Sequence, residues 1–495
     1  MSFSPLIQAL VPPPDPVRCC EQLASLPYRV FLDSATRDAR LGRYSFLTAD
    51  PVAVIRSKGP RTEWIDPASD QSRAVDGDPL TAVRAFLAPF ASAPVPGLPP
   101  FQGGAAGLVA YDWGLELERL PAPICDDLAL DDVVLGIYDW VLAWDHVESR
   151  AWLISTGIPA VEPAVRATRA AERAADVLAR LRAEPSSQTA ASSVGSMCRP
   201  VAAASPAPGA HPVSGWWDPR LALRSSFTRR DYLDAVGRVR DYIVAGDIFQ
   251  ANLSQRFDAP LTEPAWSLYR RLRASSPAPF AAFVDFPDAV VLSASPERFL
   301  RVDVTGSVET RPIKGTRPRG VGPEHDAALG QALVESLKDR AENLMIVDLM
   351  RNDLSRVCEP GSVRVSELFA LERYATVYHL VSTIVGQLAP GADALDLLRA
   401  AFPGGSITGA PKLRAMEIIA ELERRRRGVY CGAIGYWSLS GALDTNVAIR
   451  TAVTRGGRVY FSAGGGIVAD SDPAGEYQET LDKARGLIAA LVVPE

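Results

Sequence analysis

Hydrophobic and polar positions along the chain follow two periods, one typical of helices and one typical of strands. In the first part of the chain, Val161 to Leu181 carries apolar residues at helical spacing, and Asp132 to Trp144 resembles short strands. In the second part the pattern predicts three helical segments: Tyr232 to Ala245, Glu324 to Asp353 and Tyr477 to Leu491. Strand-like runs alternate with them: Ala289 to Ser293, Gly432 to Leu439 and Arg458 to Ser462. We therefore expect helices and strands throughout, with no solenoid-length repeat.

One segment between these two parts departs from the pattern. From Ala183 to about Gly215 the sequence turns to Ser, Ala and Pro, a composition that cannot bury enough apolar surface to offset the entropy of ordering the chain. We interpret residues 184–215 as a loop or linker. It would join an amino-terminal region, residues 1–183, to a carboxy-terminal domain, residues 216–495.

Composition narrows the class of protein. With 47% hydrophobic and 22% charged residues and a net charge of -6, the chain is an ordinary globular protein without the basic stripe that binds nucleic acid. No apolar run approaches the roughly 20 residues that cross a bilayer, and Met1 to Pro14 lacks the pattern of a signal peptide. We expect a cytoplasmic enzyme that acts on a small molecule and binds neither nucleic acid nor membrane.

The cysteines do not form a recognisable site. The six are scattered, without a CxxC pair, and the four histidines are too few to make structural zinc attractive. Cys358 or Cys431 could be a nucleophile, but the favoured interpretation is a small buried apolar residue in a reducing compartment.

Glycine and proline concentrate in four segments that could bring backbone N–H groups close to a ligand: Pro312 to Gly320, Phe402 to Lys412, Cys431 to Trp437 and Ser462 to Pro473. In the second of these, the run GGSITGAP could form an anion-binding nest for a carboxylate. Ordinary tight turns explain the same composition, and glycine content alone favours the turns.

A helix that begins at Asp472, with Pro473 at its first position, places Glu476, Glu479 and Lys483 on one face. Two carboxylates one turn apart are a plausible Mg²⁺ site, because hard cations prefer oxygen ligands. A solvated face with a Glu479–Lys483 pair is the alternative, and the spacing alone favours it.

Two further charged residues stand beside apolar positions. Glu342 adjoins a stripe of apolar or small residues that recurs every fourth position: Leu329, Leu333, Leu337, Ala341, Met345 and Leu349. Near a buried face it needs a partner, either a metal or a basic neighbour such as Arg340 or Lys338. Lys314, between Ile313 and Gly315, could have a lowered pKa and act as a nucleophile, although most lysines are surface charges.

Together these segments resemble the chorismate-utilising enzymes. The resemblance covers about Phe227 to Leu487 and rests on long motifs in the family's order: PIKGTRPR, DRAENLMIVDLMRNDLSRV, HLVSTI, AFPGGSITGAPKLRAMEII, GAIGYWS and SAGGGIVADSDPAGEYQET. Residues 1–183 match more loosely, through Leu32 to Ser34, Gly42 to Ser45 and Phe101 to Trp113. The resemblance implies an α+β fold of two large packed β-sheets with helices on the outside, and it makes residues 216–495 the chorismate-binding catalytic domain.

Family positions then imply a set of site residues. The magnesium ligands fall on Glu342 and Glu479, with Glu476 near the metal, and the metal would hold the ring carboxylate of chorismate. Arg450 would bind a carboxylate, a task suited to guanidinium. Backbone N–H groups around Thr408, Gly409, Ala410, Gly464 and Gly465 would do the same. The matching site in relatives is also lined by Tyr430, His379 and Lys483, in roles that the resemblance does not fix.

Two positions separate branches of the family. Members that add water to chorismate have a lysine where this chain has Gln250, so the resemblance favours amination. Anthranilate synthases usually have alanine at the position of Lys314, whereas aminodeoxychorismate synthases have lysine. The implied mechanism is attack of Lys314 on C2 of chorismate, departure of the C4 hydroxyl with a proton from Glu297, and addition of ammonia at C4.

Nothing in the chain resembles a glutaminase, so we expect ammonia from a separate glutamine amidotransferase subunit, with free ammonium as a substitute. In relatives, residues around the positions of Leu32 to Ser34 (motif LxS) and of Arg43 to Ser45 (motif RYS) bind tryptophan. Here they suggest a possible tryptophan pocket at Ser34, Arg43, Tyr44 and Ser45, although Asp33 replaces the glutamate of many relatives.

Two other functions remain open on the sequence. Anthranilate synthase component I shares every feature except the lysine at position 314. A non-catalytic, chorismate-binding regulatory protein is the second, but it would need neither the acid at Glu297 nor the nucleophile at Lys314.

Overall fold

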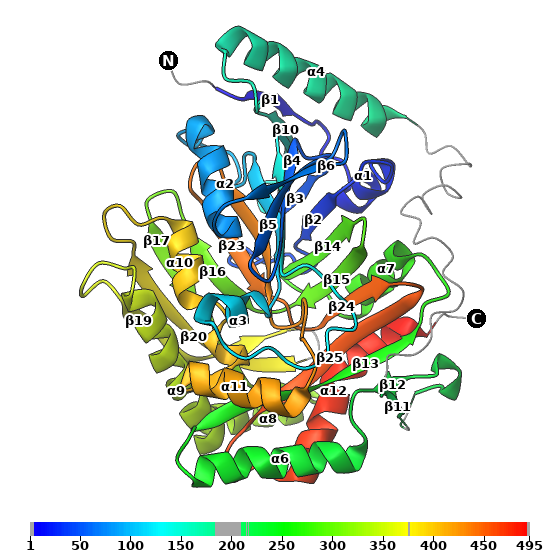
Figure 1. The fold of residues 1–495 in the computed structure, drawn as a ribbon, viewed down its shortest axis with the longest axis vertical. Coiled ribbons are helices and arrows are strands. Elements are labelled where there is room, and N and C mark those ends of the chain that lie inside the picture. Colours follow the sequence, from blue (N-terminus) through cyan, green and yellow to red (C-terminus); the bar gives the residue numbers. More distant parts are fainter. Residues whose placement is uncertain (1–3, 184–208, 214, 216, 375–376, 493–495) are drawn as a thin grey trace.

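The computed structural model describes residues 4–183, 209–213, 215, 217–374 and 377–492. Two large antiparallel β-sheets occupy the centre of the molecule and helices lie outside them (Figure 1). The expected α+β fold of two packed sheets with outer helices is therefore confirmed.

The first sheet, sheet A, has 13 strands. In spatial order they are β1 (Leu6–Ala9), β10 (Arg150–Ser155), β9 (Trp140–Asp145), β3 (Tyr44–Thr48), β2 (Arg29–Asp33), β14 (Phe280–Phe286), β15 (Ala289–Ser295), β24 (Thr451–Arg455), β25 (Arg458–Ile467), β13 (Gln250–Pro260), β12 (Arg224–Ser225) and β11 (His211–Pro212), with β21 (Gly409–Ala410) also paired to β13.

The second sheet, sheet B, has 12 strands. In spatial order they are β18 (Ile313–Pro318), β20 (Val377–Gln387), β17 (Ser307–Thr310), β16 (Arg298–Val302), β23 (Leu443–Val447), β22 (Ala433–Ser438), β7 (Gly104–Val109), β8 (Val133–Tyr138), β4 (Ala53–Lys58), β5 (Arg61–Asp66) and β6 (Gln71–Val75), with β19 (Arg364–Arg373) paired to β20.

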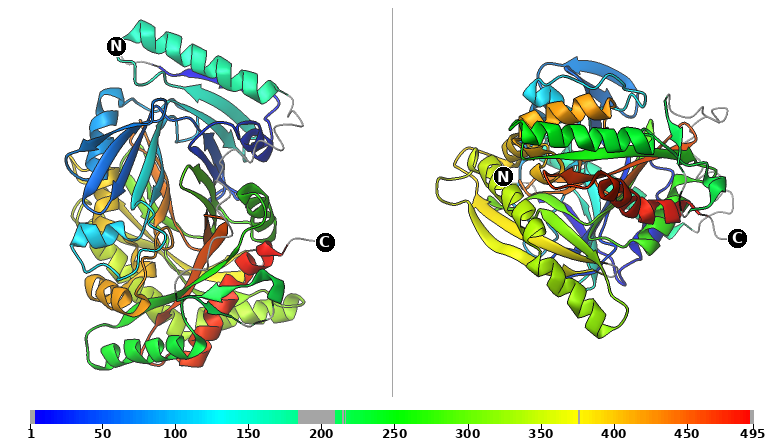
Figure 2. Two further views of the ribbon diagram at one scale, coloured as in Figure 1. Left: turned by 45° about the vertical axis from the view of Figure 1, so that its right-hand side comes forward. Right: turned by 90° about the horizontal axis from the view of Figure 1, so that it is seen from below.

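The helices pack on the outer faces and ends of the sheets (Figure 2). They are α1 (Pro16–Gln22), α2 (Pro79–Leu87), α3 (Trp113–Glu118), α4 (Pro163–Arg182), α6 (Arg229–Val244), α7 (Ala265–Ser275), α8 (Pro323–Glu335), α9 (Leu337–Ser355), α10 (Ala394–Ala401), α11 (Lys412–Glu423) and α12 (Pro473–Leu491). Three of them matter for the site: α12 lies on β25, α11 on β13, and α9 on β18 and β20.

Most segments expected from periodicity form the elements expected of them. The three strand-like runs of the second part lie in β15, β22 and β25, and the Tyr232 to Ala245 segment forms α6. The carboxy-terminal helix begins as predicted, because the Asp472 side chain caps α12 by accepting a hydrogen bond from the Gly475 N–H, with Pro473 in the first turn.

The expectation of one continuous helix from Glu324 to Asp353 is wrong. The chain breaks at Ser336, whose extended backbone ends α8 and begins α9, and its hydroxyl accepts a hydrogen bond from the Asp339 N–H. The every-fourth-residue stripe therefore does not form one face, and Leu337 is 80% exposed. Serine favours this break because its side chain replaces a helical backbone partner.

Both sheets draw strands from the two sides of the Ser/Ala/Pro-rich segment. Sheet A joins β1, β2, β3, β9 and β10 to later strands, and sheet B joins β4 to β8 to later strands. Most of the predicted linker, residues 184–208, lies outside the described residues. The boundaries at residues 183 and 216 stay predictions, but the two flanking parts share their sheets rather than packing as separate layers.

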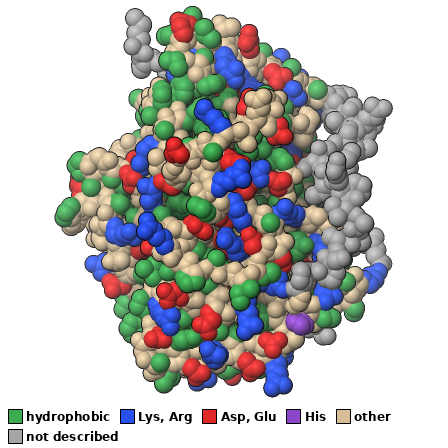
Figure 3. Space-filling view, viewed as in Figure 1, with side chains coloured by type: hydrophobic (Ala, Val, Ile, Leu, Met, Phe, Trp, Pro, Cys, Tyr) green, Lys and Arg blue, Asp and Glu red, His purple; other side chains and the backbone are tan. Residues whose placement is uncertain are grey.

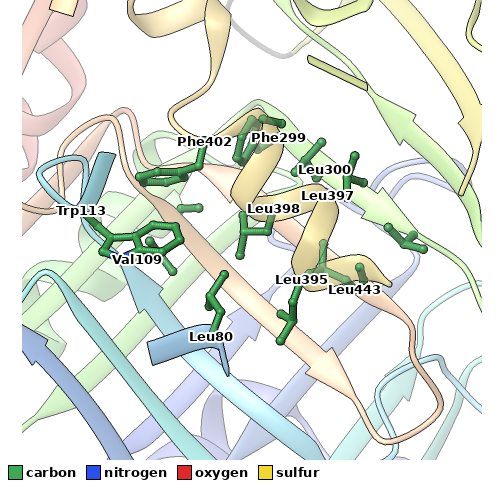
Figure 4. Close-up of a cluster of buried hydrophobic side chains, with 14 of the residues drawn as sticks. Leu80, Val109, Trp113, Phe299, Leu300, Leu395, Leu397, Leu398, Phe402 and Leu443 are labelled. Carbon is green, nitrogen blue, oxygen red and sulfur yellow. The ribbon is translucent and has the colours of Figure 1, made fainter. Parts of the chain in front are cut away.

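A large apolar cluster fills the space between sheet B and α10 (Figure 4). Leu395, Leu397 and Leu398 project from α10 toward the strands, and Phe402 follows the helix, its ring 5.5 Å from that of Trp113. The helix begins with a capping box between Asp393 and Asp396, and its apolar positions recur on one face. This cluster anchors the segment that leads into residues 402–412, which belong to the site.

On the face drawn in Figure 3, acidic and basic side chains are interspersed rather than gathered by sign. Across the described residues, none of the helices is long and apolar enough to cross a membrane.

We predict that Leu397→Ala lowers the free energy of unfolding by about 2–5 kcal/mol, because it removes a fully buried side chain and leaves a cavity. Chemical denaturation monitored by circular dichroism measures the change. Leu413→Ala is the matched control, since Leu413 is 45% exposed and its truncation should have a small effect. Equal losses for both variants would contradict the account of this core.

Candidate active site

The site lies where the end of sheet A meets the edge of sheet B. Gly464, Gly465 and Gly466 of β25 form its floor, opposite β13. A side-chain carbon on Gly466 would lie 2.2 Å from Gln250 Nε2 and 3.4 Å from Lys314 Nζ. Since Gln250 belongs to sheet A and Lys314 to sheet B, the absence of a side chain at Gly466 allows the two sheets to bring these groups together.

Gln250 presents a free amide to this space. The residue is 1% exposed, yet neither its Nε2 nor its Oε1 has a hydrogen-bond partner among the described residues. Its backbone is held by β21, where a side chain on Gly409 would lie 2.1 Å from the Gln250 carbonyl oxygen. A buried amide without a partner is costly, so its groups fit a ligand that supplies the missing hydrogen bonds.

Lys314 is half-buried near the start of β18. Burial lowers the pKa of its ammonium, and the nearby charge of Lys483 lowers it further, while Glu342 and Glu297 act in the opposite direction. The ammonium forms no hydrogen bond or ion pair with the described residues. A lysine of this kind has a larger fraction of nucleophilic free amine at neutral pH than an exposed one.

Glu297 lies between β15 and β16 and is 4% exposed. Burial raises the pKa of its carboxyl group to about 7, although the Ser406 hydroxyl donates a hydrogen bond to its Oε1 at 2.7 Å and Lys314 stabilises the charged form. A carboxyl group with this pKa can hold a proton near neutral pH and release it, which suits a general acid.

His379 lies in β20 and is buried. Its Nδ1 lies 2.9 Å from the Thr316 hydroxyl, while its Nε2 has no partner among the residues that the structure describes. Burial, together with the charge of Arg450, lowers the pKa of the imidazole to about 3. His379 is therefore neutral at physiological pH, with one nitrogen available to a ligand.

Arg450 directly precedes β24 in a left-handed backbone conformation, with φ 50°, and its carbonyl accepts a hydrogen bond from the Ala294 N–H. Burial lowers the pKa of the guanidinium. No carboxylate in the described part of the chain pairs with it. Arg450 is half-buried, and since an unpaired, partly desolvated guanidinium favours an anion, it fits the ligand carboxylate that the sequence predicts.

The acidic face of α12 lies over the same glycine floor. A side-chain carbon on Gly465 would lie 3.1 Å from Glu476 Oε2 and 3.2 Å from Glu479 Oε1. Lys483 pairs with Glu479 at 2.7 Å and donates a hydrogen bond to the Gly464 carbonyl oxygen. Although burial raises the pKa of Glu479, Lys483 and Lys314 more than offset it, and the net pKa is lowered.

Glu476 and Glu342 complete the acidic group. Burial raises the pKa of both, and Glu476 accepts a hydrogen bond from the Ser471 hydroxyl at 2.7 Å. Glu342 reaches the site from α9 and interacts electrostatically with Lys314 and Glu479. Within the described ranges no three acidic, histidine or cysteine side chains lie close enough together to hold a metal ion.

This donor set nevertheless fits a hard cation in part. Glu476 and Glu479 converge on Gly465, and although Lys483 pairs with Glu479, a cation beside Glu476 would offset the remaining repulsion between the two carboxylates. Mg²⁺ commonly takes one or two carboxylates and completes its shell with water and substrate oxygens. The alternative of a solvated helix face holds for the Glu479–Lys483 ion pair. It does not hold for Glu476, which is only 6% exposed.

Three further predicted site residues have contacts that fix their positions. Thr408 is buried, and its carbonyl oxygen accepts a hydrogen bond from the Asn252 N–H, so with Ala410 it ties the turn to β13. Tyr430 packs beside Arg427, whose guanidinium lies 5.7 Å from its ring. Their part in substrate binding stays a prediction.

The structure does not support Cys358 or Cys431 as a nucleophile. Burial raises the pKa of Cys358 to about 11 and of Cys431 to about 12, so neither is a thiolate at neutral pH. The other described cysteines, Cys19, Cys20 and Cys125, are also free, and Cys198 lies outside the described residues.

The predicted tryptophan pocket lies elsewhere, in a cavity of about 210 Å³ whose lining includes Ser34, Arg43 and Tyr44. Ser45 is not part of that lining, because it is fully buried and its hydroxyl accepts a hydrogen bond from the Ser34 N–H. The Asp33 carboxylate also lines the cavity but is bound to Arg273.

Two residues of the site were not singled out from the sequence. Ser406 holds the Glu297 carboxyl, and Thr316 fixes the orientation of the His379 ring. Both lie inside the motifs GGSITG and KGT, so the motifs marked the segments, but only the folded geometry pairs each hydroxyl with its partner.

Comparisons with known proteins place this chain among enzymes that bind chorismate. The family model of chorismate binding enzymes matches residues 29–489. Aminodeoxychorismate synthase component 1 of Klebsiella aerogenes is 44% identical over 471 residues, 95% of each chain. Anthranilate synthase component 1 of Pseudomonas aeruginosa is 40% identical, covering 96% of this chain and 92% of the relative. The crystal structure of anthranilate synthase component I from Streptococcus pneumoniae has a TM-score of 0.73 at 33% identity, over 91% of this chain and 93% of that one.

The raised pKa of Glu297 generates a prediction about stability. The folded state keeps this proton up to about pH 7, whereas the unfolded chain releases it near the ordinary value of 4.5. The wild type should therefore lose stability relative to Glu297→Gln as pH rises through this window, by about 3 kcal/mol in total. Denaturant unfolding of both proteins at several pH values between 4 and 8, about one unit apart, measures the difference. A difference that does not vary with pH would exclude the shift.

Proposed function

The chain belongs to the chorismate binding enzyme family, and on that premise we propose that it aminates chorismate at C4. The product would be 4-amino-4-deoxychorismate, the precursor of p-aminobenzoate in folate synthesis. The observation that carries the proposal is the pairing of a half-buried, unpaired lysine, Lys314, with a buried acid, Glu297, in one site. Relatives named aminodeoxychorismate synthase component 1, at 41–44% identity, support it.

The proposed reaction divides the substitution into two steps. The free amine of Lys314 forms a bond to C2 of chorismate, the ring double bonds shift, and the C4 hydroxyl leaves as water with the proton of Glu297. Ammonia then forms a bond to C4, the double bonds shift back, and the C2–nitrogen bond to Lys314 breaks. The proton released by the entering ammonia restores Glu297, so the net change exchanges ammonia for water.

The remaining side chains would bind and orient the substrate. The unpaired guanidinium of Arg450 suits a carboxylate, and the neutral His379 offers Nε2 as a further hydrogen-bonding group. The free amide of Gln250 lies close to Lys314. It would therefore face the chorismate ring while Lys314 attacks it. No lysine occupies position 250, so the site lacks the base with which water-adding relatives activate water.

Mg²⁺ would be held by Glu342 and Glu479, with Glu476 nearby. When bound, the ion would neutralise the acidic group and fix the ring carboxylate of chorismate, withdrawing electron density from the ring. The support is the convergence of Glu476 and Glu479 on Gly465 and the raised pKa of Glu342, which favours a cationic partner.

Ammonia would come from a separate glutamine amidotransferase subunit. The name component 1, borne by the similar synthases, supports a second component. Anthranilate synthase component 1 is the second candidate function, because such enzymes are up to 43% identical to this chain. Lys314 favours the amination that retains the enolpyruvyl group.

A further proposal concerns tryptophan. The cavity lined by Ser34, Arg43 and Tyr44 also has apolar and charged side chains in its lining, which suits an aromatic amino acid. We expect isothermal titration with tryptophan to show saturable binding, and titration with leucine, which lacks the indole ring, to show none. Absence of heat with tryptophan, at protein concentrations that still convert chorismate, would contradict this proposal.

Mass spectrometry of the product tests the main proposal. With chorismate, Mg²⁺ and excess ammonium at alkaline pH, the purified chain should form an aminated product that keeps its enolpyruvyl group. Lys314→Ala should reduce the rate by at least about a hundredfold, because the covalent route is lost. Lys58→Ala is the matched control, since Lys58 pairs with Asp126 away from the site.

Other products would decide between the alternatives. Anthranilate plus pyruvate would assign the chain to the second candidate function. Binding of chorismate without conversion, in wild type and both variants, would indicate a regulatory protein.

A further inference from the structure

A buried ion pair lies behind the turn that holds the acid. Glu423 ends α11, Arg427 follows four residues later, and both side chains are buried. The guanidinium forms two hydrogen bonds with the carboxylate, from Nε to Oε2 at 2.9 Å and from Nη2 to Oε1 at 2.7 Å. The rings of Tyr111 and Tyr430 lie 4.6 and 5.7 Å from it. Two simultaneous bonds to one carboxylate fix the plane of the guanidinium.

The donors of Arg427 also reach two other segments of the chain. Nη1 donates to the Ile407 carbonyl oxygen at 3.1 Å, and Nη2 donates to the Asn252 carbonyl oxygen in β13. Glu423 in turn accepts hydrogen bonds from the Ser254 N–H and hydroxyl, both at 2.8 Å. One ion pair thus joins α11, β13 and the short 3₁₀ turn that contains Ile407.

That turn carries the contact to the acid. Ser406 directly precedes Ile407, and its buried hydroxyl donates to the Glu297 carboxyl group at 2.7 Å. Because the Ile407 carbonyl is anchored by Arg427, the backbone beside Ser406 cannot rotate without losing a buried hydrogen bond. The position of the Ser406 hydroxyl therefore depends on the guanidinium of Arg427.

Stability alone does not require an ion pair at this place. Buried pairs can often be replaced by apolar residues of similar volume at little cost, because the desolvation of two charges offsets their attraction. Apolar residues cannot supply a planar set of donors aimed at three acceptors, here the Glu423 carboxylate and the carbonyl oxygens of Ile407 and Asn252. The arrangement therefore specifies a local geometry.

We propose that Arg427 is a positioning residue for the acid: by holding the Ile407 carbonyl, it sets the Ser406 hydroxyl against the carboxyl group of Glu297. The Ser406 hydrogen bond favours the ionised carboxyl group, so a displaced turn leaves Glu297 protonated to higher pH and slower to release its proton. This inference rests on the proposed function, in which Glu297 is the acid.

Infrared titration of the Glu297 carboxyl group tests the proposal without any turnover. The full chain is titrated across neutral pH, and the spectrum of Glu297→Gln is subtracted to isolate this group. Ser406→Ala should raise the midpoint of ionisation by about one pH unit, because the carboxylate loses a hydrogen bond. Arg427→Lys keeps the charge but loses the planar fork, and it should shift the midpoint in the same direction by a smaller amount. In the Ser406→Ala background it should add no shift.

Two further variants separate positioning from general damage. Arg29→Lys alters another buried arginine, which binds the Asp285 carboxylate and the Cys20 carbonyl oxygen in the same way, and it should leave the midpoint unchanged. If Arg427→Lys fails to fold, the double variant Glu423→Leu with Arg427→Met replaces both charges by apolar side chains. It should shift the midpoint toward that of Ser406→Ala.

The outcomes also separate this inference from the proposed function. An unchanged midpoint in the folded Arg427 variant, or in Ser406→Ala, would refute the positioning role. An equal shift with and without the Ser406 hydroxyl would refute it too, as would a matching shift in Arg29→Lys. If the titrations follow expectation but the chain forms no aminated product, the proposed function fails while Arg427 still positions the Glu297 carboxyl group.

Discussion

The close approach of two β-sheets across a bare glycine backbone is the constraint on which the rest of the site depends. A side-chain carbon on Gly466 would collide with the amide of Gln250, and one on Gly465 would crowd Glu476 and Glu479. Without these glycines, β25 could not serve as a floor shared by Gln250 of sheet A, Lys314 of sheet B and the acidic face of α12. Helices α12, α11 and α9 pack on the strands of this junction and hold it in place.

The site owes its chemistry to polar and charged side chains that are removed from water but have no partner within the protein. Arg450 and Lys314 have no counter-ion among the described side chains, and the amide of Gln250 and Nε2 of His379 lack hydrogen-bond partners. Such groups destabilise a folded protein unless a ligand satisfies them. The same desolvation raises the pKa of Glu297 to about 7 and lowers that of Lys314, so one physical cause prepares an acid and a nucleophile side by side.

Charge balance is the second property of the site. At the site Glu479 pairs with Lys483, and the charge of Lys314 also lowers the pKa of its carboxyl group, whereas the rest of the chain pairs its carboxylates mainly with arginine. A compact ammonium can approach a carboxylate group without the fixed bidentate geometry of guanidinium.

Sequence alone determined several of the outer helices and strands, the family and most of the candidate site residues, because periodicity, capping and long motifs are local signals. The sequence-based prediction failed at Ser336, where a capping hydroxyl separates two helices that the periodicity predicts as one. The sequence also did not reveal that both sheets combine strands from the two halves of the chain. Only the tertiary structure paired Ser406 with Glu297 and Thr316 with His379. These are contacts between residues far apart in sequence or on different elements, and their energies depend on burial, which no local pattern encodes.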